Sequence, residues 1–287
     1  MLSAHCNRLN DMNLYVSDMD GTLLGDDSQV SATTASILNR LMTQNGLLFT
    51  VATARTPATV VPLMQQVRAQ LPFIVLSGAA LWNVQENRFE QVHAIPAEVV
   101  DRVTDVFERH GLHPLIYRNH ADTMIYTHHC GQLSASEAKF VAERQHLPFK
   151  RFILDDSDYR HSPDEAMLIF AMNDYPTLER VYNEIAESIP CSPMLYCDSC
   201  DPSVALLEVY AQGCSKAAAI RRLATKVGAE RIVVFGDNRN DLAMFQAAHT
   251  AIAVENAVPE IKAVADIIIG PNTSDSVARW LSINNEQ

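Results

Sequence analysis

The run Asp18-Met19-Asp20-Gly21-Thr22 is the first stretch of the chain whose residue types could do chemistry, and it follows the apolar segment Leu14–Val16. Two carboxylates two residues apart can approach one site from a single turn. One can then attack a substrate as a nucleophile while the other moves a proton. Gly21 allows the backbone to turn sharply. Taken alone, the run also fits an ordinary acidic turn, because such turns are common after strands.

A second acidic run, Gly236-Asp237-Asn238-Arg239-Asn240-Asp241, follows the strongly apolar segment Ile232–Phe235. Its two carboxylates and two amides suit a hard cation that prefers oxygen ligands. Mg²⁺ in particular binds a couple of carboxylates together with waters and substrate phosphate. A solvated turn that caps a helix is the alternative, but the spacing G-D-x-x-N-D favours a metal site.

Two further segments carry groups that can hold phosphate. In Thr53-Ala54-Arg55 a hydroxyl and a backbone N–H can bind phosphate oxygens. Lys216 begins an expected helix, and a lysine beside two carboxylates can neutralise a phosphoryl group during its transfer. Each signal is weak by itself, because a threonine at a strand end or an exposed lysine is common.

These segments follow short apolar strands that alternate with amphipathic helices near both ends of the chain, which indicates a parallel sheet covered on both faces. In open α/β sheets, ligands bind at the carboxyl ends of the strands. The α/β rhythm stops after about residue 82 and resumes near Ser215, and the region between reads as a separate α+β unit. The sequence therefore predicts a doubly wound, mostly parallel sheet interrupted by an inserted domain. Strands are expected at 13–17, 47–52, 73–76, 232–235, 250–254 and 267–269.

Composition excludes several classes of protein. The chain has 22 Lys and Arg against 34 Asp and Glu, a net charge of −12, and no basic cluster that would bind nucleic acid or an anionic membrane surface. No apolar run approaches the roughly 20 residues that cross a bilayer. Met1–Asn13 lacks the apolar core of a signal peptide, so we expect a cytoplasmic protein. Any phosphate must be attracted by a local cation or metal.

The cysteines and histidines of the middle region give no complete metal site. Cys191, Cys197 and Cys200 include one C-x-x-C, but no second ligand pair follows at a suitable spacing, so we expect a reduced hairpin. We expect the His128-His129 pair and nearby His120 to be surface residues of the inserted domain. For Trp82 and Phe89, contact with a substrate and packing at the domain junction both stay open.

The order of the four chemical segments resembles the haloacid dehalogenase (HAD) superfamily, and the resemblance covers the whole chain. The run Ala253–Lys262 resembles the segment that follows the acidic motif in the Cof-type branch. The insertion matches the type-IIB cap of that branch. The resemblance implies a HAD core domain over residues 1–82 and 204–287, and a substrate-selecting cap domain over residues 83–203.

The resemblance also implies a role for individual residues. Asp18 matches the nucleophile that forms an aspartyl-phosphate, and Asp20 matches the general acid and base. Mg²⁺ is implied as cofactor, with Asp18, the backbone carbonyl of Asp20, and Asp237 as ligands. Phosphate binding is implied for Thr53, Ala54, Lys216 and Asn240, and supporting positions for Gly236 and Asp241, with Asn240 and Asp241 orienting Lys216 or metal-bound water.

Two positions depart from the pattern of the family. Ala54 stands where the second motif usually has glycine, and Ser77 stands where the Cof branch often has asparagine. The first change is expected to cost little. The second puts a contact from that asparagine to substrate in doubt, although serine can still form a hydrogen bond.

The implied function is Mg²⁺-dependent hydrolysis of a small phosphate monoester, with a sugar phosphate as first choice. The alternatives are a phosphatase of pyridoxal phosphate or flavin mononucleotide, a phosphotransferase or mutase, and a non-enzymatic module that binds Mg²⁺ and a phosphorylated metabolite. A dehalogenase is disfavoured, because that branch needs neither the second aspartate nor the metal ligands. The expected partner is a small phosphorylated metabolite, with no nucleic acid, membrane or obligate protein partner.

Overall fold

The computed structural model describes residues 12–198 and 201–285. The chain divides into two compact units. The first unit comprises Met1–Thr53, Leu63–Phe73 and Lys216–Gln287, and the second comprises Ala54–Pro62 and Ile74–Ser215. The expected domain limits at residues 82/83 and 203/204 stay predictions.

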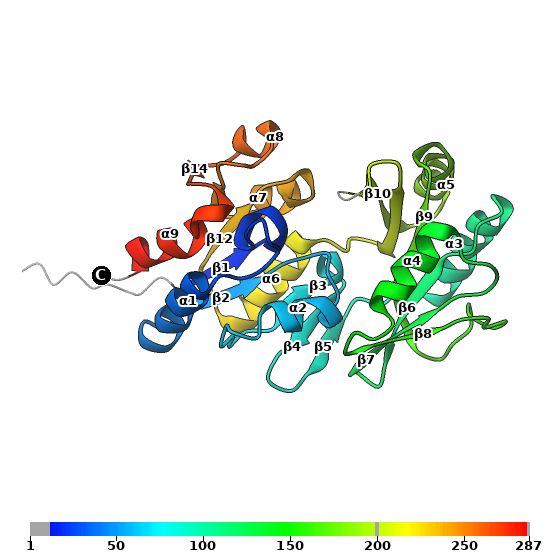
Figure 1. Ribbon diagram of the computed structural model, residues 1–287, viewed down its shortest axis with the longest axis horizontal. Coiled ribbons are helices and arrows are strands. Elements are labelled where there is room, and N and C mark those ends of the chain that lie inside the picture. Colours follow the sequence, from blue (N-terminus) through cyan, green and yellow to red (C-terminus); the bar gives the residue numbers. More distant parts are fainter. Residues whose placement is uncertain (1–11, 199–200, 286–287) are drawn as a thin grey trace, which may run out of the picture. The chain divides into compact units, whose positions relative to one another are not determined.

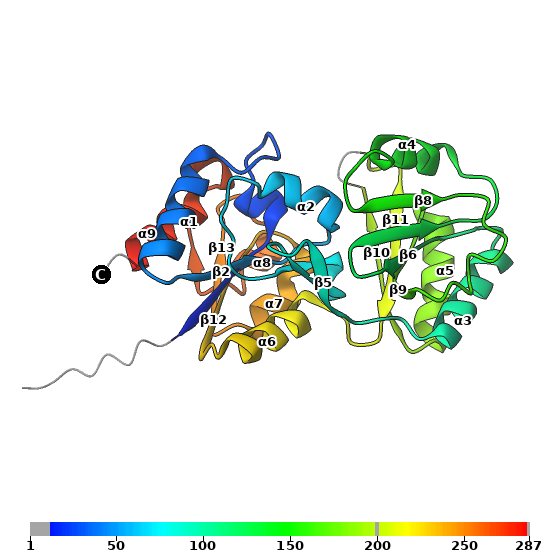
Figure 2. The ribbon, with the colours of Figure 1, turned by 90° about the horizontal axis from the view of Figure 1, so that it is seen from below.

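The first unit is built on a five-stranded sheet with the order β14-β13-β12-β1-β2, and every neighbouring pair is parallel. Figure 2 shows α1 and α9 on one side of this sheet and α6 and α7 on the other, which is the doubly wound arrangement that the sequence predicts. The strands are β1 (Asn13–Ser17), β2 (Leu48–Val51), β12 (Arg231–Gly236), β13 (Thr250–Ala253) and β14 (Ile267–Ile268). The helices are α1 (Ala32–Gln44), α6 (Lys216–Val227), α7 (Leu242–Ala247), α8 (Pro259–Lys262) and α9 (Ser276–Asn285).

Local sequence signals set the ends of α1. The Ser31 hydroxyl accepts a hydrogen bond from the backbone N–H of Thr34 at 2.9 Å, which caps the first turn. The helix stops before Gly46, whose φ of +67° is the left-handed conformation that ends many helices. Leu38, Leu41 and Met42 are buried and fix the helix to the sheet.

The prediction that residues 73–76 form a third strand of the large parallel sheet is wrong. Strand β3 (Phe73–Val75) belongs instead to a sheet of three with β4 (Ala80–Asn83) and β5 (Arg88–Val92). Between β3 and β4 the chain turns at Leu76, Ser77 and Gly78, which have φ values of 51°, 53° and 99°. This tight turn places β4 beside β3. The expected hairpin between β4 and β5 is present.

The second unit contains a six-stranded sheet with the order β10-β11-β9-β6-β7-β8, antiparallel except between β7 and β8. Its strands are β6 (Leu115–His120), β7 (Met124–His128), β8 (Lys150–Ile153), β9 (Glu165–Asn173), β10 (Cys191–Cys197) and β11 (Ala205–Ala211). Because β11 pairs with β9 and β10, the second unit extends beyond residue 203, to Ser215. Helix α2 (Pro57–Leu63) precedes this sheet in the chain.

Helices α3 (Ala97–Arg109) and α5 (Tyr175–Ser188) cover one face of the six-stranded sheet (Figure 1). Their apolar side chains form one buried cluster with alternate residues of the strands, such as Ile169 on β9 and Leu207 on β11. Helix α4 (Ala135–Arg144) lies on the other face, where Phe140 contacts Phe170 with ring centroids 5.3 Å apart. The unit thus has the α+β character that the sequence predicts.

The expectation of surface histidines is wrong for His128 and His129, which are both buried. Nδ1 of His128 lies 2.7 Å from Oδ2 of Asp156, so a partner from a later loop compensates for part of its burial. His120 is half-buried and stacks on Tyr126 with ring centroids 3.9 Å apart.

The other expectations for the second unit concern its aromatic and cysteine residues. Trp82 packs edge-on against Phe89 at 4.8 Å, and both side chains are buried. Cys191 and Cys197 lie at the two ends of β10 as free thiols, in a hairpin with β11. Cys200 lies outside the described residues. In the described part of the chain, none of the helices combines the length and apolar character that a membrane span requires.

Candidate active site

The two aspartates of the first motif differ in burial, because Asp18 directly follows β1 and Asp20 lies in the turn beyond it. The backbone N–H of Asp18 donates to the carbonyl of Phe235 at 2.9 Å, which holds Asp18 against the end of β12. Asp18 is buried, whereas Asp20 is exposed. Asp20 (φ −72°, ψ 122°) and Gly21 (φ 75°, ψ −2°) have the central angles of a type II turn, which needs glycine at its second central position.

Gly21 also makes room for the second acidic motif. A Cβ at Gly21 would lie 2.5 Å from Oδ2 of Asp237, closer than carbon and oxygen can approach without displacement. The hydroxyl of Thr22 donates to Oδ1 of the same carboxylate at 2.9 Å. The turn after β1 therefore packs closely against Asp237, the residue that follows β12.

Lys216, the first residue of α6, joins the two motifs. Its ammonium donates to Oδ1 of Asp18 at 2.5 Å and to Oδ1 of Asp241 at 2.7 Å. All three side chains are buried. Burial and the charge of Asp241 raise the pKa of Asp18 well above its usual range, although Lys216 opposes that change. Burial lowers the pKa of Lys216, but the two carboxylates more than reverse this and hold the lysine charged.

Asp241 organises the loop after β12. Its Oδ2 accepts hydrogen bonds from the backbone N–H groups of Asp237 at 3.1 Å and Asn238 at 3.2 Å. A Cβ at Gly236 would lie 2.8 Å from that same oxygen, so glycine is needed for the carboxylate to fold back onto its own loop. Asp241 thus fixes Asp237 through the backbone and Lys216 through its side chain.

The site residues fit a divalent cation. Asp18, Asp237 and Asp241 each offer a carboxylate oxygen, and these three oxygens lie within 4.8 Å of one another. Burial raises the pKa of Asp237 to about 6. A bound cation would stabilise the charged form of such crowded carboxylates, and a set of oxygen donors suits Mg²⁺. Because both oxygens of Asp241 already accept hydrogen bonds, Asp18 and Asp237 are the better ligands.

The other predicted site residues differ in their burial. Thr53 is buried just beyond β2, and Ala54 after it is half-buried. Asn240 is exposed in the turn before α7. The structure therefore brings Asp18, Lys216, Asp237 and Asp241 together, whereas Asp20 and Asn240 are both exposed.

Sequence reasoning missed two asparagines that hold the turn after β1. Nδ2 of Asn256 donates to the carbonyl of Gly21 at 2.7 Å, and Nδ2 of Asn272 donates to the carbonyl of Leu24 at 2.8 Å. The backbone N–H of Asn272 also donates to Oδ1 of Asn256 at 3.0 Å. The only sequence signal was the position of Asn256 three residues after the end of a strand, β13 (Thr250–Ala253).

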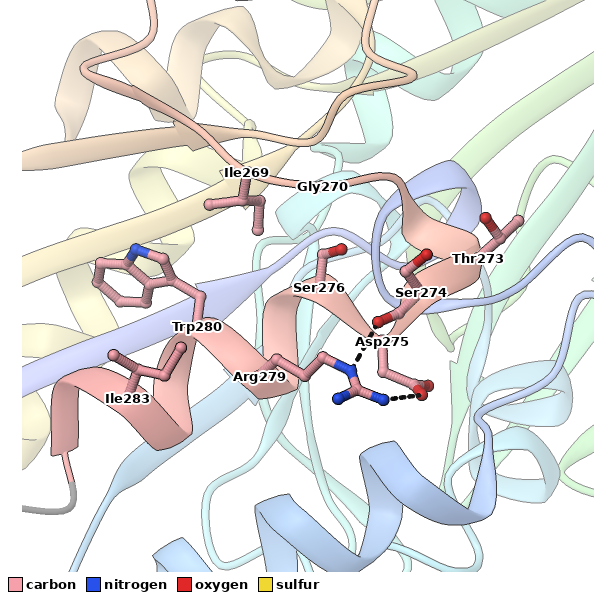
Figure 3. A pocket seen from close by; sticks show the side chains of 9 residues that line it. All are labelled: Ile269, Gly270, Thr273, Ser274, Asp275, Ser276, Arg279, Trp280 and Ile283. Atoms are coloured by element: carbon pink, nitrogen blue, oxygen red, sulfur yellow. Dashed lines mark hydrogen bonds and ion pairs between the residues drawn. The ribbon is translucent and has the colours of Figure 1, made fainter.

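A hollow of about 560 Å³ beside α9 is a different feature of the first unit (Figure 3). Trp280 and Ile283 line its apolar side, and Arg279 donates to the carbonyl of Ser274 at 3.0 Å. The residues that line it include none of the predicted site residues, so its size has no bearing on the chemistry of Asp18.

Comparison with known proteins decides the family. A family model described as haloacid dehalogenase-like hydrolase matches residues 15–281. The chain belongs to this family. The predictions of family and of fold class are therefore confirmed.

Relatives of this hydrolase are named phosphatases. A putative phosphatase of Haemophilus influenzae is 26% identical over 91% of this chain and 94% of its own length. A 5-amino-6-(5-phospho-D-ribitylamino)uracil phosphatase of Bacillus subtilis is 25% identical over 93% of this chain and 96% of its own length. The pyridoxal phosphate phosphatase of Escherichia coli is 25% identical over 92% of this chain and 95% of its own length. These names support the predicted enzyme class, a phosphoric monoester hydrolase.

Solved structures share the fold. TM0651 from Thermotoga maritima superposes with a TM-score of 0.75 at 21% identity, over 94% of this chain and 96% of that one. The subclass IIB sugar phosphatase BT4131 superposes with a TM-score of 0.71 at 21% identity, over 95% and 98%. The likeness extends over nearly the whole length of each chain, both units included.

Proposed function

We propose that this hydrolase is a Mg²⁺-dependent phosphatase that cleaves a small phosphate monoester through an aspartyl-phosphate on Asp18. The observation that carries the proposal is the contact of Lys216 with both Asp18 and Asp241 beside the carboxylate of Asp237. A lysine held charged by two carboxylates can stabilise the equatorial oxygens of a phosphoryl group. Asp18, Asp237 and the backbone carbonyl of Asp20 would hold Mg²⁺, which offsets the repulsion between a carboxylate and a phosphate dianion.

The reaction has two steps at phosphorus. Lys216 engages Oδ1 of Asp18, so Oδ2 is the oxygen left to attack. In the first step the Asp18 oxygen bonds to phosphorus, the bond to the leaving oxygen breaks, and Asp20 gives that oxygen its proton. In the second step Asp20 takes a proton from water, the hydroxide bonds to phosphorus, and the bond to Asp18 breaks. Phosphate leaves, Asp18 is again a carboxylate, and Asp20 again carries its proton.

The environments of the two aspartates suit these roles. Asp18 is buried in one fixed position, as a nucleophile requires, whereas the exposed Asp20 can exchange a proton with water. Thr53 and Ala54 follow β2, the parallel neighbour of β1, and would add a hydroxyl and a backbone N–H to the phosphate site.

The substrate class is a small phosphorylated metabolite. A sugar phosphate is our first choice, and the names of the Bacillus and Escherichia relatives keep phosphorylated ribitylaminouracil and pyridoxal phosphate as alternatives. We assign substrate selection to the region 83–203. The thiols of Cys130, Cys191 and Cys197, which form no disulfide within the described residues, fit a reducing compartment, which supports the cytoplasm as the site of action.

Asp18→Asn tests the proposal. The variant keeps the size of the side chain and its hydrogen bond to Lys216 but is a far weaker nucleophile. We expect turnover of p-nitrophenyl phosphate with Mg²⁺ to fall below about a tenth of the wild-type rate, which corresponds to roughly 1.4 kcal/mol of barrier. The melting temperature shows whether the variant is folded. A folded variant that retains more activity than this would refute Asp18 as the nucleophile.

A further inference from the structure

Asn256, three residues after β13, is an exposed residue whose side-chain amide is engaged at both ends. Its Nδ2 donates to the carbonyl of Gly21 at 2.7 Å, and its Oδ1 accepts from the backbone N–H of Asn272 at 3.0 Å. An exposed amide can bond to water almost as well, so such contacts add little to stability. A contact with a turn 235 positions away in the chain therefore needs another explanation.

The turn that Asn256 contacts is not fixed by its own residues. Gly21 has a φ of 75°, and glycine adopts positive and negative φ about equally well. The backbone can therefore rotate at this point unless contacts from outside the turn prevent it. The carbonyl of Asp20, which we assign to the metal, belongs to the peptide just before Gly21, so a rotation about φ of Gly21 moves it.

The two asparagines restrain this turn from outside. Within the turn, the backbone N–H of Leu24 donates to the carbonyl of Met19 at 2.9 Å. Nδ2 of Asn272 donates to the carbonyl of Leu24 at 2.8 Å. Because the backbone N–H of Asn272 also bonds to Asn256, the two residues form a bridge from Leu24 to Gly21.

The segment 256–258 also contacts the second acidic motif. The backbone N–H of Val258 donates to the carbonyl of Asp237 at 2.9 Å. The carboxylate of Asp237 in turn accepts a hydrogen bond from Thr22, the residue after Gly21. One short segment thus holds both stretches of backbone that carry proposed metal ligands, and it is placed to keep those ligands at a fixed separation.

We propose that Asn256 is a positioning residue that holds the Gly21 carbonyl, and with it Asp20, in the orientation that Mg²⁺ binding and proton transfer require. The inference rests on the proposed phosphatase function and extends it to a residue outside the acidic motifs. Asn256 acts through the turn and is not itself a ligand. Partners that orient ligands in this way matter, since their loss typically costs roughly 10- to 100-fold in metal affinity or activity.

The test uses three alanine variants. Asn256→Ala removes both hydrogen bonds, and because the residue is exposed the variant should fold, which its melting temperature without metal checks. Asn272→Ala removes the contact with Leu24 but leaves the bond to Gly21 in place. Asn284→Ala is the matched control, because Asn284 is also exposed and its Nδ2 also donates to a backbone carbonyl at 2.8 Å.

Titration calorimetry with Mg²⁺ alone gives a readout that needs no turnover. We expect the Kd for Mg²⁺ to rise roughly tenfold in Asn256→Ala, less in Asn272→Ala, and not at all in Asn284→Ala. At saturating Mg²⁺, Asn256→Ala should slow glycerol 3-phosphate more than p-nitrophenyl phosphate, because the alkoxide needs the proton of Asp20 more than the aryl oxide does. A merely structural role would lower both rates in the same proportion.

Either of two results would overturn the inference. One is a Kd for Mg²⁺ in Asn256→Ala that equals the value in Asn284→Ala. The other is equal slowing of the two substrates in Asn256→Ala. A wild-type chain that binds Mg²⁺ but hydrolyses neither ester would contradict the proposed function, yet a Mg²⁺ affinity that depends on Asn256 would still support its positioning role.

Discussion

The ammonium of Lys216 lies 2.5 Å from Oδ1 of Asp18, although 198 positions of the chain separate the two residues. The contact joins the first strand of the parallel sheet to a helix that begins after the second unit is complete. Asp18 takes up this position only when both halves of the first unit have assembled around β1 and β12. The carboxylate that we assign as nucleophile is thereby tied to the stability of the fold.

Replacing Lys216 by methionine should destabilise the protein. The change leaves Asp18 and Asp241 buried without their common cation, and breaking a buried ion pair costs about 3–5 kcal/mol. Urea denaturation measures the loss in free energy of unfolding. Lys226→Met, at an exposed position near the end of the same helix, is the control and should change stability little. Adding Asp241→Asn should recover part of the loss, and wild-type stability in the single variant would contradict the assigned ion pairs.

Mg²⁺ should stabilise the folded chain through Asp18 and Asp237. A ligand that binds only the folded state at a hundred times its Kd adds about 2.7 kcal/mol, so the melting temperature should rise on titration with Mg²⁺. Asp237→Ala should remove most of this rise, whereas Asp26→Ala, at an exposed position, should keep it. Activity should also disappear with a chelator and return with added Mg²⁺. Full activity in metal-free buffer would exclude the proposed metal role.

The site was easier to predict than the sheet around it. Asp18 and Asp237 lie together because residues directly after neighbouring parallel strands meet at one edge of the sheet, and Lys216 reaches Asp18 from the first turn of α6. The pairing of β3 could not be predicted in the same way. A strand of three apolar residues does not encode its neighbour, and the left-handed turn at Leu76–Gly78 carries no signal except its glycine.

The burial of His128 and the backbone contacts of Asp241 were beyond the sequence. His128 is at the end of β7 and is compensated by Asp156, which is 28 residues away on a later loop, and residue type alone predicts only intermediate burial for a histidine. The resemblance implied that Asp241 orients Lys216, and Oδ1 of Asp241 does bond to that lysine. Only the folded loop shows that the other oxygen of Asp241 holds the backbone of Asp237.

Lys150 should make the stability of the protein depend on pH. It is almost fully buried, with its ammonium 4.1 Å from the ring centre of Tyr117 and 4.6 Å from that of Phe152. Burial, together with the charge of Arg144, lowers the pKa of Lys150 well below its usual range. The aromatic rings offset part of the free-energy cost of burying the ammonium, because a cation is attracted to the face of a ring. The unfolded chain therefore binds a proton below about pH 10.4 that the folded chain holds more weakly, and stability falls as pH decreases from there.

Lys150→Met removes this contribution. The variant should gain stability relative to wild type, and the gain should be larger at pH 7 than at pH 10, as measured by urea denaturation at both values. Lys139→Met, at an exposed position of α4, should show no such trend. A difference between Lys150→Met and wild type that is the same at both pH values would show that Lys150 is charged in the folded state.

Substitutions of Asp20 and of Asp18 should impair different steps of the reaction. Asp20 is exposed and is the first central residue of the type II turn that follows the buried Asp18, so it can reach a leaving oxygen but does not occupy the nucleophile's position. Asp20→Asn should slow alkyl phosphates far more than aryl phosphates, because an alkoxide needs a proton to leave and an aryl oxide needs it much less. The same variant lacks the base for the second step, so phospho-enzyme should accumulate with an aryl phosphate and be trapped by acid quench.

Asp26→Asn, at another exposed position, is the control and should show neither effect. Equal slowing of aryl and alkyl phosphates without phospho-enzyme would leave Asp20 a role in positioning the metal, and the acid–base assignment would have to be abandoned.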